Sequence, residues 1–391
     1  MLLGSLSDIE KIFLVLVILY LIESVFWVRR GAAVFSSLAG RFLGSGRSFT
    51  VISNEVGRLV LSGPLPIDAS FIAQPIPISI SSDGVLEFLI SCPNEPQRPI
   101  QTHRFFDWQQ LQTTKAFENQ VQVDELALCT VPSFHAARLL ASKLVELARL
   151  PEQERLIGIA QWTASELDVE ATSARIDQWR SQTRNLKRTN LTFFVWIFPF
   201  GFSYYSGIIP GSYHPYFLVG YLSGFFALWW WSVWRLYCDH RKLLPDHRLG
   251  RLKSVLTSLV SPGAALRSRD HLARELFTFN HPVTIAAALF PETMFVEYAR
   301  RIWRDLEYPL LPIAPEEIGT SGIAVATEHH ARTKCLVETL LKSKGLLVDE
   351  LTSPPTRLDS TSIAYCPRCH REYTQSDAKC LPCGEREILM I

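Results

Sequence analysis

Three long apolar stretches constrain the fold of this chain more than any other feature. They cover residues 12–28, 191–209 and 215–234. A helix needs about 20 apolar residues to cross the ~30 Å hydrocarbon core of a bilayer, and each stretch approaches that length. The sequence therefore predicts a multi-pass α-helical membrane protein with three spans, in which an anchor is followed later by a transmembrane hairpin over 191–234.

Basic residues predict how these spans are oriented. Lys and Arg gather after the first stretch, before the second and after the third: Arg29, Arg30, Arg41, Arg47, Arg184, Lys187, Arg188, Arg235, Arg241, Lys242, Arg248, Arg251 and Lys253. The segments on the opposite side, 1–11 and 210–214, contain one Lys between them. Because positive charge marks the cytoplasmic side, we expect the N-terminus outside and the main domains and C-terminus in the cytosol.

The segment between the first two spans predicts a cytosolic α+β domain over 48–189. Residues 48–131 are rich in β-branched residues with partial alternation, which indicates strands. Within them, Asp83-Gly84 is predicted to supply the left-handed turn of a hairpin. Residues 133–189 repeat apolar side chains at helical spacing, and Ser133 is a predicted N-cap.

The segment after the third span predicts a cytosolic helical region over 235–351. We expect Gly345 to end its last helix, since glycine accepts the left-handed conformation there. Residues 352–363 are rich in Ser, Thr and Pro and indicate a linker. A small separate module is then expected over 364–387.

Four of the eight cysteines form the most specific chemical motif: Cys366, Cys369, Cys380 and Cys383, arranged as two C-x-x-C pairs. Four thiolates at this spacing supply the tetrahedral ligand set of a structural Zn²⁺ site, with His370 outside it. Iron could occupy the same cage. Thiolates of this kind need a reducing compartment, in agreement with a cytosolic tail.

The segment CPRCHREYTQSDAKCLPCG resembles a zinc ribbon, a module with two metal-binding turns. The resemblance covers 364–387 only, and it implies that the four cysteines hold the metal. It also implies that the module binds nucleic acid, binds protein or braces a fold. In layout alone, the rest of the chain resembles uncharacterised bacterial membrane proteins that carry a terminal ribbon.

Charge argues against nucleic acid as the partner. The net charge of the chain is +1. Within the ribbon, the basic and acidic side chains cancel: Arg368, Arg371, Lys379 and Arg386 stand against Glu372, Asp377, Glu385 and Glu387. Phosphate binding needs a net basic face, so this composition disfavours it.

Several other residues are candidates for a functional site, and each also has a structural explanation. Glu23 lies inside the first apolar stretch, where a carboxylate can relay protons or hydrogen-bond to a neighbouring span. The cluster Asp239–His247 contains two Asp-His-Arg triplets and could hold a metal, but Pro245 interrupts the helix that would align them. A basic patch against lipid headgroups is therefore favoured. Cys129 and His135 could form a nucleophile–base pair, but no oxyanion-hole motif accompanies them, which argues against that function.

A structural metal, anchoring spans and the lack of a convergent polar site in the sequence favour a binding role, and no Walker loop, HExxH or GxSxG motif occurs. We expect a membrane-anchored binding or scaffold protein whose structural zinc ribbon docks or braces a cytosolic protein partner. One alternative is a membrane enzyme or transporter component that uses Glu23 or the Asp239–His247 cluster. Another is a membrane-tethered nucleic-acid binder.

Overall fold

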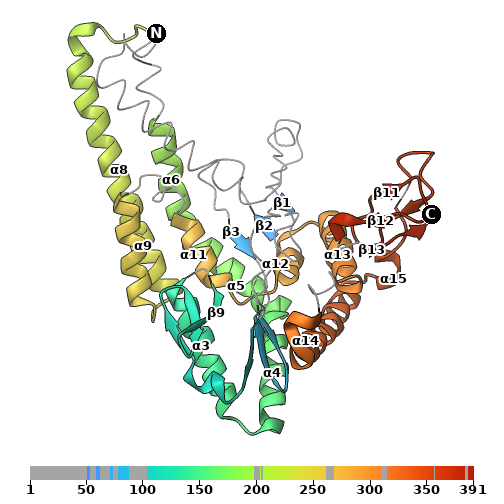
Figure 1. Cartoon of the computed structure of the whole chain (residues 1–391). Coiled ribbons are helices and arrows are strands. Elements are labelled where there is room, and N and C mark those ends of the chain that lie inside the picture. The colour runs from blue at the N-terminus through green and yellow to red at the C-terminus, as the bar shows by residue number, and fades with distance from the viewer. Residues whose placement is uncertain are drawn as a thin grey trace. The chain divides into compact units, whose positions relative to one another are not determined.

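The computed structural model describes residues 51–52, 59–61, 71–73, 78–87, 104–131, 133–197, 203, 206–260, 268–309, 315–355, 357–383 and 386–391. The chain divides into two compact units, whose helices and strands are labelled in Figure 1. Unit 1 comprises Met1–Asn54, Leu59–Ile72 and Ala174–Phe277, and unit 2 comprises Glu55–Arg58, Ala73–Ser173 and Thr278–Ile391. The predicted anchor over 12–28, with Glu23, lies outside the described residues.

Helices dominate the described residues, and short strands accompany them. The α-helices are α3 (Phe134–Arg149), α4 (Glu152–Glu166), α5 (Val169–Gln182), α6 (Arg184–Ile197), α8 (His214–Leu243), α9 (Arg248–Val260), α11 (Ser268–Phe277), α12 (Pro282–Leu289), α13 (Glu292–Glu307), α14 (Pro315–Ser343) and α15 (Val348–Leu351). The strands are β1 (Val51–Ile52), β2 (Leu59–Leu61), β3 (Phe71–Ala73), β4 (Ile78–Ile80), β5 (Gly84–Glu87), β6 (Phe105–Asp107), β7 (Lys115–Phe117), β8 (Gln120–Val123), β9 (Leu126–Thr130), β10 (Ala364–Tyr365), β11 (Glu372–Tyr373), β12 (Lys379–Cys380), β13 (Arg386–Glu387) and β14 (Leu389–Met390). They form small sheets in the orders β1-β2-β3, β4-β5-β6, β7-β8-β9, β11-β10-β14 and β12-β13.

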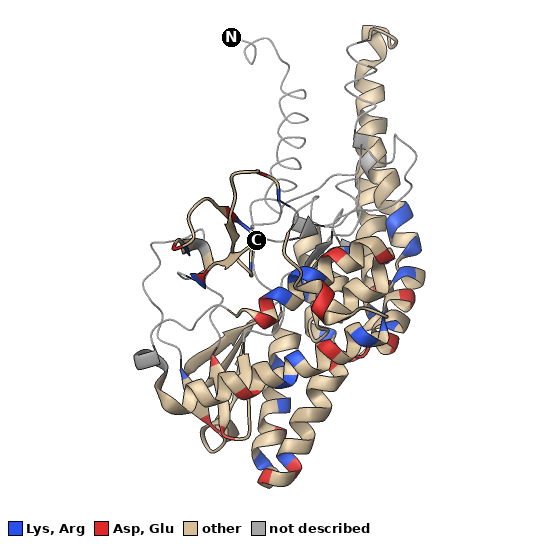
Figure 2. Ribbon diagram, turned by 90° about the vertical axis from the view of Figure 1, so that its right-hand side faces the viewer, with Lys and Arg blue, Asp and Glu red and all other residues tan. Residues whose placement is uncertain are grey.

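One helix of the described residues, α8, is long and apolar enough to cross a membrane. Its 30 residues extend about 45 Å at 1.5 Å per residue. No charged Asp, Glu, Lys or Arg occurs from His214 to Trp234, and the basic end begins at Arg235. Figure 2 shows this division, with an uncharged length of helix followed by Lys and Arg. The predicted span over 215–234 thus lies within a helix suited to a bilayer.

The predicted count of three spans is not supported, because the described residues contain one such helix. The predicted span over 191–209 begins in α6, whose 14 residues extend about 21 Å, and its residues 198–202, 204 and 205 lie outside the described ones. α6 packs along α8 in unit 1. Trp196 Nε1 donates to the Tyr221 carbonyl oxygen at 2.9 Å, and the rings of Phe193 and Phe225 lie 5.0 Å apart.

The core of unit 2 forms where α3 packs with the neighbouring strands. Ser133 caps α3 as predicted, since its Oγ accepts the N–H of Ala136 at 3.1 Å. Helix and strands share one buried apolar cluster, which includes Leu140, Leu144, Leu147, Val121, Val123 and Leu128. Burying each large side chain of this kind stabilises the fold by about 1.5–3 kcal/mol.

The hairpin of β4 and β5 has the predicted pairing but uses its glycine differently. Ile80 pairs with Val85 in antiparallel register. Gly84 does not have a positive φ. Gly345 has a φ of 77° and follows α14, as predicted. A Cβ on residue 84 would lie 2.2 Å from the carbonyl oxygen of Phe106 on β6. The predicted left-handed role of Gly84 is therefore wrong, and close approach by β6 explains the residue.

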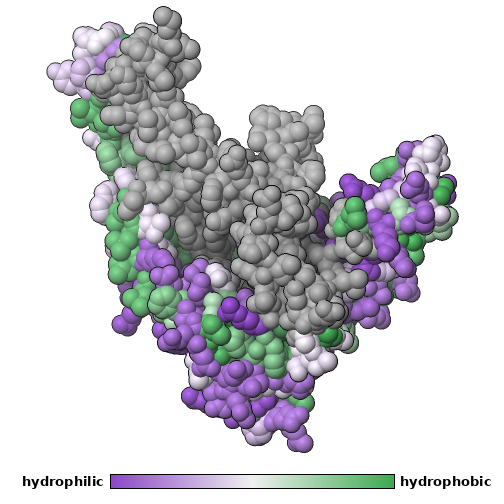
Figure 3. All heavy atoms as spheres, in the orientation of Figure 1, coloured by the Kyte–Doolittle hydropathy of each residue, from purple (hydrophilic) through white to green (hydrophobic). Residues whose placement is uncertain are grey.

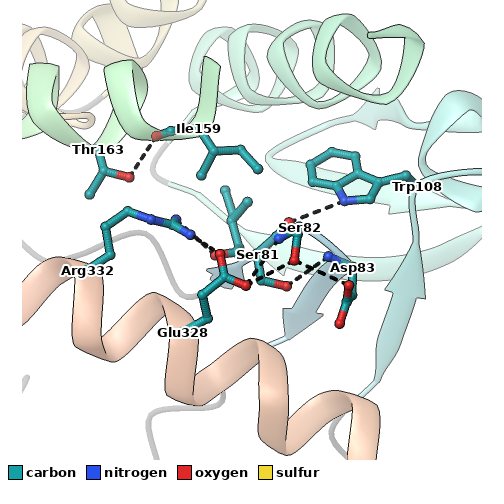
Figure 4. A network of polar contacts seen from close by, with 9 residues as sticks. Ser81, Ser82, Asp83, Trp108, Ile159, Thr163, Glu328 and Arg332 are labelled. Atoms are coloured by element: carbon teal, nitrogen blue, oxygen red, sulfur yellow. Dashed lines mark hydrogen bonds and ion pairs between the residues drawn. The ribbon is translucent and has the colours of Figure 1, made fainter. Parts of the chain in front are cut away.

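A polar network joins α14 to the turn of this hairpin within unit 2 (Figure 4). Glu328 Oε2 lies 3.1 Å from Ser82 Oγ and 3.4 Å from the Ser82 backbone nitrogen. Arg332, one turn further along α14, pairs with Glu328 and donates through Nη1 to the Ile80 carbonyl oxygen at 3.2 Å. These contacts hold α14 against a hairpin far away in sequence.

Candidate metal centre

The C-terminal tail places each pair of cysteines at the turn of a short hairpin. β10 pairs with β11 on either side of Cys366 and Cys369, and β12 pairs with β13 around Cys380 and Cys383. β14 joins the other side of β10. Isolated two-stranded hairpins are marginally stable at best, so these hairpins need a further constraint. A metal ion shared between the two turns would supply it.

Backbone hydrogen bonds shape the first cysteine turn. The Cys366 nitrogen donates to the Arg371 carbonyl oxygen at 2.9 Å, and the His370 nitrogen donates to the Cys366 carbonyl oxygen at 2.8 Å. His370 adopts a φ of 60°, a conformation that costs a non-glycine residue about 1–2 kcal/mol. The surrounding hydrogen bonds therefore hold His370 in a left-handed backbone conformation that is unfavourable for it in isolation.

The four sulfur atoms converge on one point. All four Sγ atoms lie within 4.8 Å of one another, and Cys369 Sγ is 3.6 Å from Cys380 Sγ. Zn–S bonds of about 2.3 Å at tetrahedral angles place sulfur atoms about 3.8 Å apart. Three of the four side chains are buried, and Cys369 is exposed. The cluster can hold a metal ion, its spacing fits zinc, and its members are the four predicted cysteines without His370.

Proximity of the sulfurs already favours a thiolate. Hydrogen bonds from the side chains of Cys369 and Cys383 lower the pKa of the Cys366 thiol well below its ordinary value. Hydrogen bonds with Cys366 and Cys383 raise the pKa of Cys369, and the hydrogen bond with Cys366 raises that of Cys383 to about 11. One thiolate is thus favoured before an ion enters, and metal binding releases the protons of the remaining thiols.

One buried arginine contacts the sulfur cluster, and two half-buried arginines lie near it. Arg368 stands between the first two cysteines and is 8% exposed. Its Nη1 donates to Cys383 Sγ at 3.9 Å, and its Nη2 lies 3.1 Å from Asp305 Oδ1 on α13. Arg301 and Arg304, also on α13, lie in the same electrostatic neighbourhood, and burial lowers the pKa of each.

The charges of this shell match a loaded metal site. Burial raises the pKa of Asp305, while Arg368, Arg301 and Arg304 lower it. A zinc ion held by four thiolates carries a net charge of −2, and the buried guanidinium of Arg368 with the half-buried ones of Arg301 and Arg304 places positive charge beside it. The arginine shell therefore fits a metal–thiolate centre.

A second arginine attaches the other hairpin to the end of α13. Arg386 on β13 donates through Nη2 to the carbonyl oxygen of Pro309. Its guanidinium carbon lies 5.6 Å from the ring centre of Tyr308, within cation–π range. Figure 1 shows the tail strands beside α13. Both hairpins thus contact the same helix and its C-terminal end.

The other predicted sites have different outcomes. Glu23 lies outside the described residues. His240 and His247, which Pro245 was expected to keep apart, have ring centres 5.4 Å apart. Cys129 is buried, and burial followed by the charge of Glu87 raises the pKa of its thiol to about 12. A thiol with that pKa stays protonated near neutral pH, which argues against a nucleophile.

Sequence reasoning missed the contact between Arg368 and Asp305. The only signal was the arginine inside the first C-x-x-C pair, and nothing in the sequence indicated its partner 63 positions earlier. Nothing in the sequence indicated that Arg301 and Arg304 lie near this contact either, because their proximity depends on how the tail packs on α13.

Comparison with known proteins adds no assignment, since no family model, curated protein or solved structure matches this chain. A functional proposal must therefore rest on the residues of the chain itself.

Proposed function

We propose that this chain is a membrane-anchored binding or scaffold protein whose metal-bound tail is braced against α13 and docks a cytosolic protein partner. The observation that carries the proposal is the convergence of four cysteine sulfurs within 4.8 Å of one another. A four-cysteine set completes the tetrahedron and leaves no position for a substrate, as in structural zinc sites. Such a centre supports folding and binding rather than catalysis.

The membrane part of the proposal rests on α8. Large apolar side chains of this helix are exposed, among them Tyr216, Val219, Phe226, Trp230 and Trp234. Figure 3 shows hydrophobic residues along the edge of the molecule that α8 and α9 occupy. Exposing these apolar side chains to water is unfavourable, whereas lipid would cover them. Tryptophan side chains are enriched at the level of the lipid headgroups. The basic residues from Arg235 onward favour a cytosolic side for everything that follows.

Orientation can be tested through Cys335, which is exposed and does not belong to the sulfur cluster. A membrane-impermeant maleimide is applied to intact cells and to permeabilised cells that express the wild type or Cys335→Ser. We expect labelling dependent on Cys335 only after permeabilisation. Labelling of Cys335 in intact cells would place the tail outside and overturn the proposed topology.

Partner binding can be tested by comparing the wild type with Cys366→Ser/Cys369→Ser. Both are purified from detergent-solubilised membranes and their bound proteins identified, with Cys335→Ser as the matched control. The proposal expects one specific partner that is retained by the control and lost from the double variant. The same bound proteins in all three samples would show that the tail does not dock a partner.

A second candidate function is supported by the pairing of His240 with His247 at the basic end of α8. Buried ionisable groups beside a membrane helix are typical of transport or membrane chemistry. Replacing His240 and His247 by Gln would abolish activity in that case and leave partner capture by the tail intact. No observation in the described residues favours the alternative of nucleic-acid binding.

A further inference from the structure

The turn between α8 and α9 brings together side chains that the sequence separates. α8 ends at Leu243 and α9 begins at Arg248. Trp229 Nε1 on α8 donates to the carbonyl oxygen of Ser258 on α9 at 2.8 Å. Because this contact joins two residues that both lie far from the turn, α9 runs back along α8. The helix break near Pro245 therefore lies in the turn of a hairpin, which brings His240 close to His247.

Two buried imidazoles meet inside this hairpin. His240 is 1% exposed and His247 is 5% exposed, and their ring centres are 5.4 Å apart. Gly250 makes room for the second ring, since a Cβ there would lie 1.7 Å from His247 Cε1. The glycine allows the first turn of α9 to close directly over His247.

A carboxylate from α11 completes the cluster within unit 1. Glu275 Oε2 lies 3.6 Å from His247 Nδ1, and the Glu275 side chain is 12% exposed. Buried arginines also belong to this unit: Arg251 donates to the carbonyl oxygens of Leu244 and Pro245, and Arg269 donates to Thr183 Oγ1. Two imidazoles and one carboxylate are thus gathered in a region sheltered from water.

These separations match those between ligands of one tetrahedral ion. With Zn–N distances of about 2.0–2.1 Å, two imidazoles on the same ion have ring centres about 5 Å apart. A nitrogen ligand and an oxygen ligand on that ion lie about 3.4 Å from each other. The observed values of 5.4 Å and 3.6 Å are close to both.

We propose that His240, His247 and Glu275 bind a second divalent transition-metal ion of the zinc class. This function is independent of the tail and goes beyond the scaffold role. Among the described residues, the four cysteines are the group whose ligand atoms already all lie within 4.8 Å. Binding of an ion by His240, His247 and Glu275 therefore requires their side chains to rotate towards a common point. Two histidines and one glutamate leave a fourth position open for water or a substrate, unlike the closed cage of the tail.

The test measures zinc bound per chain in the full-length protein in detergent, after equilibration with zinc and removal of loosely held metal. We expect two ions in the wild type, one in Cys366→Ser/Cys369→Ser, and one in His240→Gln/His247→Gln. His330→Gln is the matched control, because His330 Nε2 contacts the Leu306 carbonyl oxygen away from this cluster. It should bind two ions. One ion in the wild type and none in the cysteine variant would overturn the proposal.

Cobalt provides a readout that does not require the histidine variant to fold. Co²⁺ bound by thiolates gives sulfur charge-transfer bands, whereas Co²⁺ bound by imidazole and carboxylate gives ligand-field bands alone. In Cys366→Ser/Cys369→Ser, we expect ligand-field bands without sulfur bands, at one equivalent of Co²⁺. Their absence from the folded cysteine variant would show that His240, His247 and Glu275 form only a buried polar cluster.

Discussion

Arg368 in the first cysteine turn and Asp305 on α13 form an ion pair in which Nη2 and Oδ1 are 3.1 Å apart, with side chains 8% and 10% exposed. The same guanidinium donates to Cys383 Sγ. One side chain therefore links the sulfur cluster to the helix that supports it. Through this link, the packing of the tail on α13 and the arrangement of the sulfur atoms depend on the same side chain.

Breaking this pair from one side should be costly. Asp305→Ala leaves Arg368 buried without its carboxylate, and loss of one partner of a buried pair costs about 3–5 kcal/mol. Replacing both by apolar residues, in Asp305→Leu/Arg368→Met, should cost less than Asp305→Ala alone, because the buried guanidinium of Arg368 is no longer left without its carboxylate. Thermal unfolding in detergent measures both. Lys143→Ala removes an exposed pair with Glu146 and should change stability by less than about 1 kcal/mol.

Metal removal should loosen the tail and spare the core of unit 2. The strands β10 to β14 are two residues each, whereas α3 is held by a large apolar cluster. A chelator should therefore raise amide hydrogen exchange over 364–391 and leave 134–149 protected. Equal exchange in the tail with and without chelator would contradict a structural function for the metal.

The comparison of sequence with structure separates local signals from tertiary ones. The Ser133 cap, the end of α14 at Gly345 and the cysteine cluster were predictable, because each depends on neighbouring residues or a fixed ligand spacing. The partner of Arg368 was not, because it depends on how segments 63 positions apart return to each other, which a hydrophobic pattern does not encode. The Asp239–His247 cluster was considered as a metal site, but the interruption at Pro245 argued against the approach of His240 to His247 that the structure shows.

The predicted number of spans also shows what apolar composition alone cannot determine. The apolar composition of 191–209 predicted a span. In the described part of that stretch, Phe193 and Trp196 pack on α8, whereas Leu191 and Val195 are exposed. Apolar residues serve a lipid contact and a helix contact equally well, so composition leaves open what covers such a surface.

Gly84→Ala should destabilise unit 2 through a clash with backbone. The added Cβ would lie 2.2 Å from the Phe106 carbonyl oxygen, and a strand carbonyl moves less readily than the end of a flexible side chain. We expect a loss of about 1–3 kcal/mol, as for an overpacked core. Gly211→Ala is the control, since nothing lies within 4 Å of its added Cβ. Equal melting temperatures for the two variants would refute the close approach of β6.

Acid should destabilise unit 2 through His281 at the N-terminus of α12. Its Nδ1 accepts the N–H of Val283 at 3.2 Å, so protonating that nitrogen removes the cap. Burial, followed by the charge of His329, lowers the pKa of His281 from 6.5 to about 4. The unfolded chain thus binds a proton before the folded one does, and this contribution to stability is lost as pH falls from about 6.5 towards 4.

His281→Asn separates the cap from the titration, because asparagine caps a helix without binding a proton in this range. We expect the variant to unfold with a shallower dependence on pH between 6.5 and 4, while its stability at pH 7.5 stays within about 1 kcal/mol of the wild type. Denaturant unfolding at a series of pH values measures the slope. His329 has a pKa lowered to about 4 by burial as well, so part of the slope should remain, and His281→Asn/His329→Gln should reduce it further. An unchanged slope in both variants would show that neither imidazole is held neutral by the fold.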